Sequence, residues 1–213
     1  MFRFARSGVT TLAAAATSYS LYSHRLRASC DYDRKGTPDT ISYNGTFLEL
    51  AGVGMRRKNL YVTMVDVYVV GMYLSPKTVV DLKRVKSGNF SDIILKSCDK
   101  DEVRAGATLK FVRDVGQSSI VQAFDEAFTG CDKEEIRVFK DALSQEVGEG
   151  GLKKGETLAF YWLGKNGLEI KKNDSAGKIF IQQEIGKRLL GVYLDPEKTV
   201  SRELVETVAS TLA

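Results

Sequence analysis

The segment that most constrains the fold is the apolar run Leu60–Leu74, LYVTMVDVYVVGMYL. It is rich in β-branched and aromatic residues, which predicts a long β-strand. Strand side chains alternate between two faces, so Val70, Met72 and Leu74 would share one face. The other face, which would include Tyr73, is also largely apolar. We therefore expect both faces of this strand to be covered, by protein layers or, on one side, by a bound apolar molecule.

Three basic residues, Arg56, Arg57 and Lys58, lie on the approach to this strand. A buried charge needs a partner, and the planar guanidinium of arginine suits a carboxylate because it offers two parallel hydrogen bonds. One interpretation is an anchor for an anionic head group whose tail lies on the apolar face. The other is an internal ion pair with Asp66 or Glu49, or a solvated loop. Residues alone leave both interpretations open.

The remaining patterns predict one domain over residues 31–213, without repeats or linkers. Strands are indicated by alternating or β-branched runs, at TISYNGTFLEL with a turn at Asn44–Gly45, at DIILKSC, ATLKFVRDV, TLAFYWLGKNGLEIKK and KIFI. Helical spacing is indicated by five further sets: Val79, Leu82 and Val85; Ile120, Phe124, Ala127 and Phe128; Ile136, Phe139 and Leu143; Ile185, Leu189 and Val192; and Val200, Leu204, Val208 and Leu212. This order predicts an α+β fold, a mostly antiparallel sheet with a layer of helices on one face.

Helix starts are predicted at residues that can cap the free N–H groups of a first turn. Ser75 with Pro76 suits the first helix, and Asp132 followed by Glu135 resembles a capping box. Ser118 or Ser119 can cap the second helix. Asp195–Pro196 is predicted to cap the last one.

Residues 1–30 differ in composition from the rest of the chain. They hold four arginines and no acidic residue, and they are rich in Ser, Thr and Ala, which is typical of an organelle transit peptide. We expect a mitochondrial address, with a plastid as the alternative and a secretory signal as the second. No stretch of about 20 apolar residues predicts a transmembrane segment. Beyond residue 30 basic and acidic residues are equal in number, so net charge does not indicate a nucleic-acid partner.

Cysteine and histidine usage excludes several classes of site. Cys30, Cys98 and Cys131 are scattered and form no CxxC pair, which argues against a disulfide scaffold or a zinc site. His24 is the only histidine and lies in the expected transit peptide. A domain without histidine cannot run a Ser–His or Cys–His mechanism. We therefore expect no metal and no cofactor.

The stretch GVGMRRKNLYVTMVDVYVVGMYL combines a Gly-x-Gly-x-Arg run with a strand that ends in Tyr-x-x-Gly-x-Tyr. This pattern resembles the chalcone isomerase-like superfamily, and the later run LKFVRDVGQSSIVQAFDEAF and the two C-terminal helices agree with it. The resemblance covers roughly residues 40–212. It implies an open-faced β-sandwich in which a helical layer covers one side.

The resemblance also implies a comparison of site residues. Chalcone isomerases close a flavanone ring with an Arg, a strand Thr, a Tyr, an Asn and a late Ser or Thr. The Arg corresponds to Arg56, whereas the other four positions correspond to Tyr68, Ser119, Glu126 and Gly186. Plant relatives that bind fatty acids carry Tyr in place of the strand Thr and hold the carboxylate with Arg and Tyr. Fungal mitochondrial relatives are linked to haem.

The resemblance therefore implies non-catalytic binding of fatty acids or similar amphipathic carboxylates in an organelle. Arg56 and Tyr68 are the expected ligand-binding residues, no residue is expected to be catalytic, and the expected partner is a small molecule. Asp66, on the face of Tyr68 by simple alternation, is expected to weaken the anchor if it pairs with Arg56. The alternatives are an isomerase of the intramolecular lyase type and a haem-associated mitochondrial protein.

Overall fold

The computed structural model describes residues 36–60, 63–84, 90–96, 102–125, 127–164, 167–181 and 183–213. The expected transit peptide, residues 1–30, lies outside these ranges, as do Cys30 and Cys98. Within the described ranges, no helix has both the length and the hydrophobicity needed to cross a bilayer.

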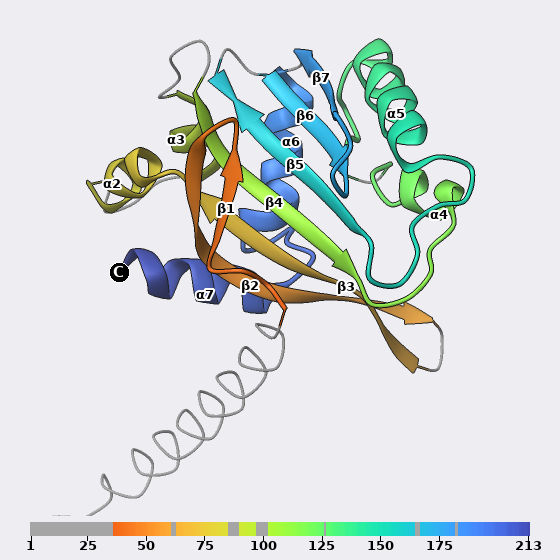
Figure 1. The fold of residues 1–213 in the computed structure, drawn as a ribbon, viewed down its shortest axis with the longest axis horizontal. Coiled ribbons are helices and arrows are strands. Elements are labelled where there is room, and N and C mark those ends of the chain that lie inside the picture. Colours follow the sequence, from red (N-terminus) through yellow and green to blue (C-terminus); the bar gives the residue numbers. More distant parts are fainter. Residues whose placement is uncertain are drawn as a thin grey trace, which may run out of the picture.

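Seven strands form one sheet in which each strand pairs antiparallel with the next along the chain (Figure 1). The strands are β1 (Thr40–Tyr43), β2 (Thr46–Leu60), β3 (Thr63–Leu74), β4 (Val103–Phe111), β5 (Thr157–Leu163), β6 (Gly167–Lys172) and β7 (Lys178–Ile181). Neighbours in sequence are therefore neighbours in space. This arrangement confirms the antiparallel sheet of the predicted α+β fold.

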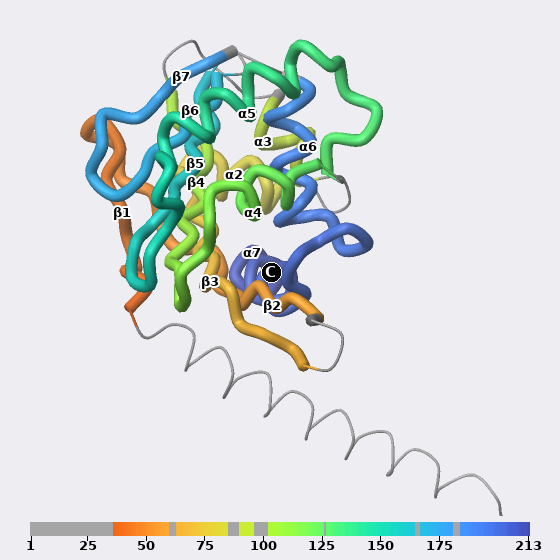
Figure 2. Tube along the Cα trace, turned by 90° about the vertical axis from the view of Figure 1, so that its right-hand side faces the viewer, coloured from red at the N-terminus to blue at the C-terminus, as the bar shows by residue number. Residues whose placement is uncertain are grey.

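Helices follow the sheet on one side, as the view along its edge shows for α6 and α7 (Figure 2). The described helices are α2 (Pro76–Arg84), α3 (Phe90–Lys96), α4 (Gln117–Gln122), α5 (Lys133–Val147), α6 (Gln183–Leu194) and α7 (Arg202–Leu212). Their apolar sides and the sheet share one continuous core, which includes Met72, Leu109, Phe139, Phe160, Leu189 and Leu204. The predicted helical layer on one face is confirmed.

The other face of the sheet carries a smaller core of Tyr43, Leu48, Tyr73 and Tyr161. The Tyr43 and Tyr161 rings lie 4.6 Å apart between centroids. The Tyr73 hydroxyl donates a hydrogen bond of 2.9 Å to the carbonyl of Pro38, which ties the segment before β1 onto this face. Protein side chains thus cover the second face of β3 at its Tyr73 end.

Several local predictions hold because the responsible contacts are short-range. Asn44 and Gly45 both have positive φ, as the tight β1–β2 hairpin requires. The Ser75 hydroxyl accepts the Thr78 N–H at 3.2 Å and caps α2. Asp132 accepts the N–H groups of the two residues at positions 134 and 135 and caps α5.

Other element predictions are wrong. The run DIILKSC was expected to form a strand, but residues 90–96 form helix α3, because this segment turns Ile94 into the core beside α6. Gly116 occupies the N-cap position of helix α4 without a side-chain hydrogen bond, so Ser118 and Ser119 lie inside the first turn. Helix α7 begins at Arg202 with Ser201 as its cap, and Asp195–Pro196 lies in the turn before it.

Candidate functional site

Strands β2 and β3 place Arg56 directly opposite Tyr68. The sequence pattern predicted Arg56 on the approach to one long strand, Leu60–Leu74. That prediction is wrong: the Gly-x-Gly-x-Arg run belongs to β2, which ends at Leu60, and β3 runs antiparallel to it from Thr63. Because opposite residues on paired strands have Cβ atoms about 4.5–5.5 Å apart, the two expected site residues are cross-strand neighbours.

A β-bulge separates Asp66 from this pair. The register shifts between Arg56 and Arg57, so that Arg57 lies opposite Asp66 and Val67 is the extra residue. The side chains of Val67 and Tyr68 both pack against the helix-side core. A bulge interrupts the alternation of faces, and the expectation that Asp66 and Tyr68 share a face is wrong for this reason.

Arg57, Asp66 and Glu203 form an ion-pair network, which we call the edge cluster. Arg57 Nε donates to Asp66 Oδ1 at 3.1 Å, and Arg57 Nη1 donates to Glu203 Oε1 at 2.7 Å. The hydrogen bond to Glu203 raises the pKa of Arg57, and Asp66 adds to the effect. The internal ion pair considered for the two arginines is therefore made by Arg57.

Arg56, Tyr68 and Tyr193 form a second group, which we call the interior cluster. No carboxylate of the described part of the chain lies within ion-pair distance of the Arg56 guanidinium. Tyr68 packs its ring on Phe111, with centroids 5.3 Å apart. Tyr193 comes from α6 and is fully buried in the helix-side core. The cluster thus carries a positive charge that nothing described here balances.

Both phenols of the interior cluster remain protonated at neutral pH. Burial raises the pKa of Tyr68. The charge of Arg56 and the hydrogen-bonding contact with the Tyr193 hydroxyl lower it in part. Burial raises the pKa of Tyr193 well above its usual value, and Tyr68 raises it further. One cation and two hydroxyl donors suit an oxyanion such as a carboxylate.

Helix α7 docks along the open edge of β2, the strand that carries both Arg56 and Arg57. Thr207 Oγ1 accepts the Val53 N–H at 3.1 Å and donates to the Val53 carbonyl at 3.0 Å. Glu203 Oε2 accepts the Met55 N–H at 3.3 Å. These side chains take the place of a further strand, which β1 is too short to supply beyond residue 49.

The two glycines before Arg56 allow this close approach. A Cβ on Gly52 would lie 2.6 Å from Val208 Cγ2, and one on Gly54 would lie 2.3 Å from Ser201 Oγ. Neither distance is possible for a real side chain. The glycines of the Gly-x-Gly-x-Arg run therefore serve the docking of α7, which in turn brings Glu203 to Arg57.

The other positions that the resemblance identified do not join the interior cluster. Ser119 is exposed on α4, and Gly186 is buried with its carbonyl accepting Trp162 Nε1 at 2.9 Å. Glu126 lies outside the described residues. Neither Ser119 nor Gly186 therefore offers a side-chain donor beside Arg56.

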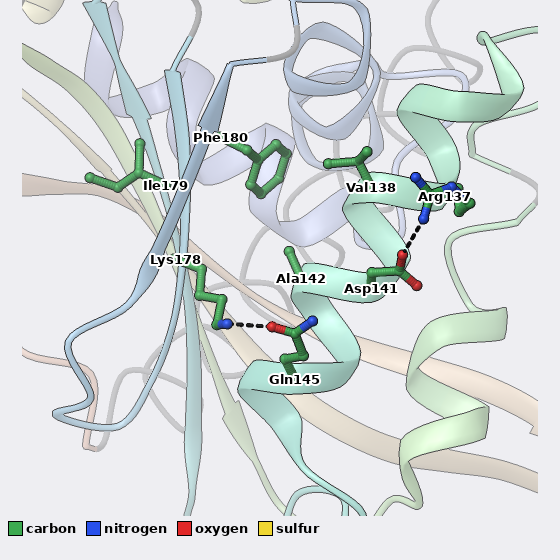
Figure 3. A pocket seen from close by; sticks show the side chains of 8 residues that line it. All are labelled: Arg137, Val138, Asp141, Ala142, Gln145, Lys178, Ile179 and Phe180. Atoms are coloured by element: carbon green, nitrogen blue, oxygen red, sulfur yellow. Dashed lines mark hydrogen bonds and ion pairs between the residues drawn. The ribbon is translucent and has the colours of Figure 1, made fainter.

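A pocket of about 330 Å³ lies elsewhere, between α5 and β7 (Figure 3). Its polar lining is already engaged: Arg137 pairs with Asp141 at 2.9 Å, and Lys178 bonds Gln145. Arg56 and Tyr68 do not line it. This groove is therefore separate from the site that the sequence indicated.

Sequence reasoning missed Tyr193 and Glu203. Their helices were predicted, but the periodic pattern marks only Ile185, Leu189 and Val192 on the inner side of α6. Glu203 is 146 residues away from its partner Arg57. No local signal connects residues so distant in the chain, and both could be found only once the helices were docked.

The crystal structure of a fatty-acid binding protein from Arabidopsis thaliana superimposes with a TM-score of 0.65 and 19% sequence identity, over 82% of this chain and 92% of that chain. A sequence comparison with curated proteins gave no match. The family model described as chalcone isomerase-like matches residues 32–206, which is most of the chain. This chain therefore belongs to the chalcone isomerase-like family.

Proposed function

We propose that this protein binds fatty acids or similar amphipathic carboxylates without transforming them. The observation that carries the proposal is the contrast between two adjacent arginines: Arg57 has two carboxylate partners, and Arg56 has none among the described residues. Arg56 faces Tyr68, which offers a protonated hydroxyl. A carboxylate from outside the chain would balance the charge and accept both donors.

The surroundings of Tyr68 suit an apolar tail. Its ring contacts Phe111, and Val70 continues the same side of β3 into the helix-side core. Because Val70 and Phe111 are already buried against the helices, an acyl chain would enter by displacing side chains at this edge of the core. The Arabidopsis protein with a similar fold is described as a fatty-acid binding protein, which supports the proposal.

An isomerase function has less support at the same site. Stabilising a phenolate nucleophile and a polarised ketone requires several preorganised donors. The four family positions other than the arginine carry Tyr68, Ser119, Glu126 and Gly186. We expect naringenin chalcone to cyclise at its uncatalysed rate and without stereoselectivity. A cyclisation rate well above background that is lost in Arg56→Ala would favour the isomerase function over non-catalytic binding.

A haem-associated role has less support, because the described residues include no histidine, the usual axial ligand of haem iron. His24 lies outside the described residues. Burial raises the pKa of the Cys131 thiol, which disfavours the thiolate that ligates iron.

We also propose that the protein works in mitochondria, because residues 1–30 contain four arginines and no acidic residue. A fluorescent reporter fused behind residues 1–30 should enter mitochondria. A matched fusion in which Arg3, Arg6, Arg25 and Arg27 are replaced by Gln should stay in the cytosol. Plastid import or a glycosylated secreted product of the first fusion would contradict the address.

The binding proposal is tested by measuring the affinity for dodecanoate and the melting temperature on the same variants. Hydrogen bonds to charged groups contribute about 1.5–3 kcal/mol, so Arg56→Ala should weaken binding roughly ten- to a hundredfold. The melting temperature of the ligand-free protein should stay unchanged or rise, because an unbalanced charge is removed. Arg57→Ala is the matched control and should keep its affinity. Unchanged affinity in Arg56→Ala together with a lower melting temperature would leave Arg56 a structural residue.

A further inference from the structure

Tyr193 has a buried hydroxyl without a regular partner. Its side chain has 0% exposure, and its oxygen makes no hydrogen bond within normal geometry among the described residues. Buried tyrosine hydroxyls usually find a partner, and each exception calls for an explanation. The fatty-acid site described above was built from Arg56 and Tyr68 and leaves this oxygen unused.

The unused hydroxyl is part of the interior cluster. It lies in hydrogen-bonding contact with the Tyr68 hydroxyl, which raises the pKa of Tyr193 and lowers that of Tyr68, and the charge of Arg56 acts on both phenols. Three donors from three elements, β2, β3 and α6, thus converge on one place. Helix α6 comes from a part of the chain more than a hundred residues away from β3.

The end of α6 holds Tyr193 in position. The Val200 N–H donates to the carbonyl of Val192 at 3.0 Å, and Thr199 Oγ1 donates to the carbonyl of Tyr193 at 3.2 Å. These bonds fix the last turn of the helix, from which the ring points into the core. A hydroxyl held this way is preorganised for an acceptor rather than free to turn to water.

We propose that Tyr193 is the third contact of the carboxylate site, and that the three donors select an ionised free carboxylate over its ester. This inference rests on the proposed function. An ionised carboxylate presents two oxygens with about four lone-pair positions, enough for Arg56, Tyr68 and Tyr193 together. An ester brings no charge, so it would leave the guanidinium unbalanced in a partly buried place.

The first experiment compares Tyr193→Phe with Tyr73→Phe. Both tyrosines are fully buried, but Tyr73 is hydrogen-bonded to Pro38 on the opposite face of the sheet. Tyr193→Phe should weaken dodecanoate binding about three- to tenfold, the range of one neutral hydrogen bond, while the ligand-free melting temperature stays equal or rises. Tyr73→Phe should lower the melting temperature and leave the affinity unchanged. A lower melting temperature with unchanged affinity in Tyr193→Phe would make the residue structural.

The second experiment measures selectivity with dodecanoate and methyl dodecanoate. The wild-type protein should bind the free acid at least about tenfold more tightly, and Tyr193→Phe should narrow this ratio. If the wild-type protein binds neither probe, the proposed function and this inference both fail. If it binds dodecanoate through Arg56 while Tyr193→Phe changes neither affinity nor selectivity, the proposed function stands and only this inference is overturned.

Discussion

The edge cluster and the interior cluster begin at adjacent residues of β2 and differ in every other respect. In the edge cluster Arg57 is bonded to two carboxylates, and Asp66 is 53% exposed. In the interior cluster Arg56 lies beside two phenols, and Tyr193 is fully buried without a regular hydrogen bond. The same residue type is therefore electrically satisfied at one position and unsatisfied at the next.

The difference shows how one extra residue in a strand can determine which of two adjacent arginines pairs with a nearby carboxylate. With simple alternation, Asp66 would stand on the side of Tyr68 and compete for Arg56. The bulge at Val67 moves Asp66 opposite Arg57 instead. The charges of the edge cluster are then paired within the chain, whereas Arg56 of the interior cluster has no carboxylate partner among the described residues.

The largest fall in stability should come from a change that disturbs the docking of α7 on β2, the strand that carries both arginines. In Gly54→Ala the new Cβ would meet Ser201 Oγ and the backbone of Leu204, so α7 must move and lose its cap. Overpacking and cap loss together should cost about 2–4 kcal/mol, a fall in melting temperature of roughly 5–15 °C. Gly150→Ala, where nothing lies within 4 Å of the new atom, is the control. Equal melting temperatures for the two variants would mean that α7 does not depend on Gly54.

Alkaline pH should lower the free energy of unfolding through the interior cluster and not through the edge cluster, because only the interior cluster contains tyrosines. The pKa values of Tyr68 and Tyr193 are raised in the folded protein, so above about pH 10 the unfolded chain loses these protons first. Stability is then fully present below pH 10 and falls as pH rises, by about 1.4 kcal/mol per pH unit for each such tyrosine.

Urea unfolding at pH 9, 10 and 11 measures this loss. Tyr193→Phe should show a shallower decline than wild type, and Arg57→Ala should show the same decline as wild type. Parallel curves for wild type and Tyr193→Phe would contradict the assignment of a titrating group to Tyr193. Tyr73, whose pKa burial raises to about 12, should account for part of the remaining slope.

Arg57→Ala should have a smaller effect, on stability alone. Its pairs are partly exposed, and ion pairs of this kind contribute about 0–1 kcal/mol, so unfolding free energy should fall by about 1 kcal/mol at most. The loss should shrink at high salt, because exposed charges are screened. Chemical unfolding at low and high salt measures both effects. A loss of dodecanoate affinity beyond twofold would show that the two clusters are not independent.

The smallest effect should come from Asp66→Asn. More than half of this side chain is exposed, and Arg57 keeps Glu203 as its partner, so a change of a few tenths of a kcal/mol is expected. Dodecanoate affinity should not rise, because Asp66 does not neutralise Arg56. A clear gain in affinity, measured by titration calorimetry, would place Asp66 within reach of the ligand site.

Sequence reasoning predicted the parts of the fold that depend on neighbours in the chain. The Asn44–Gly45 turn, the caps at Ser75 and Asp132 and the inward row of Val70 and Met72 follow from local geometry and periodicity, and the structure confirms them. The alternating runs also predicted the antiparallel sheet and its single helical layer.

The errors lie where distant contacts decide. Ile93 and Ile94 favour a strand by propensity, but their packing against α6 selects a helix. The bulge at Val67 is invisible in the sequence because it depends on the register with β2. The register places the two expected site residues, Arg56 and Tyr68, opposite each other, yet Tyr193, the second phenol of their cluster, comes from a helix that no local pattern links to them.

The docking of α7 has a consequence for the order of assembly. Residues 201–208 cover the open edge of β2, which lies about 150 residues earlier in the chain, as the hydrogen bonds between Val53 and Thr207 show. A chain emerging from a ribosome, or threading through a translocation pore, presents its N-terminal part first. Until its last helix arrives, β2 has an unprotected edge open to foreign strands, and chaperones that hold this stretch would be acting on the part of the molecule most exposed to misassembly.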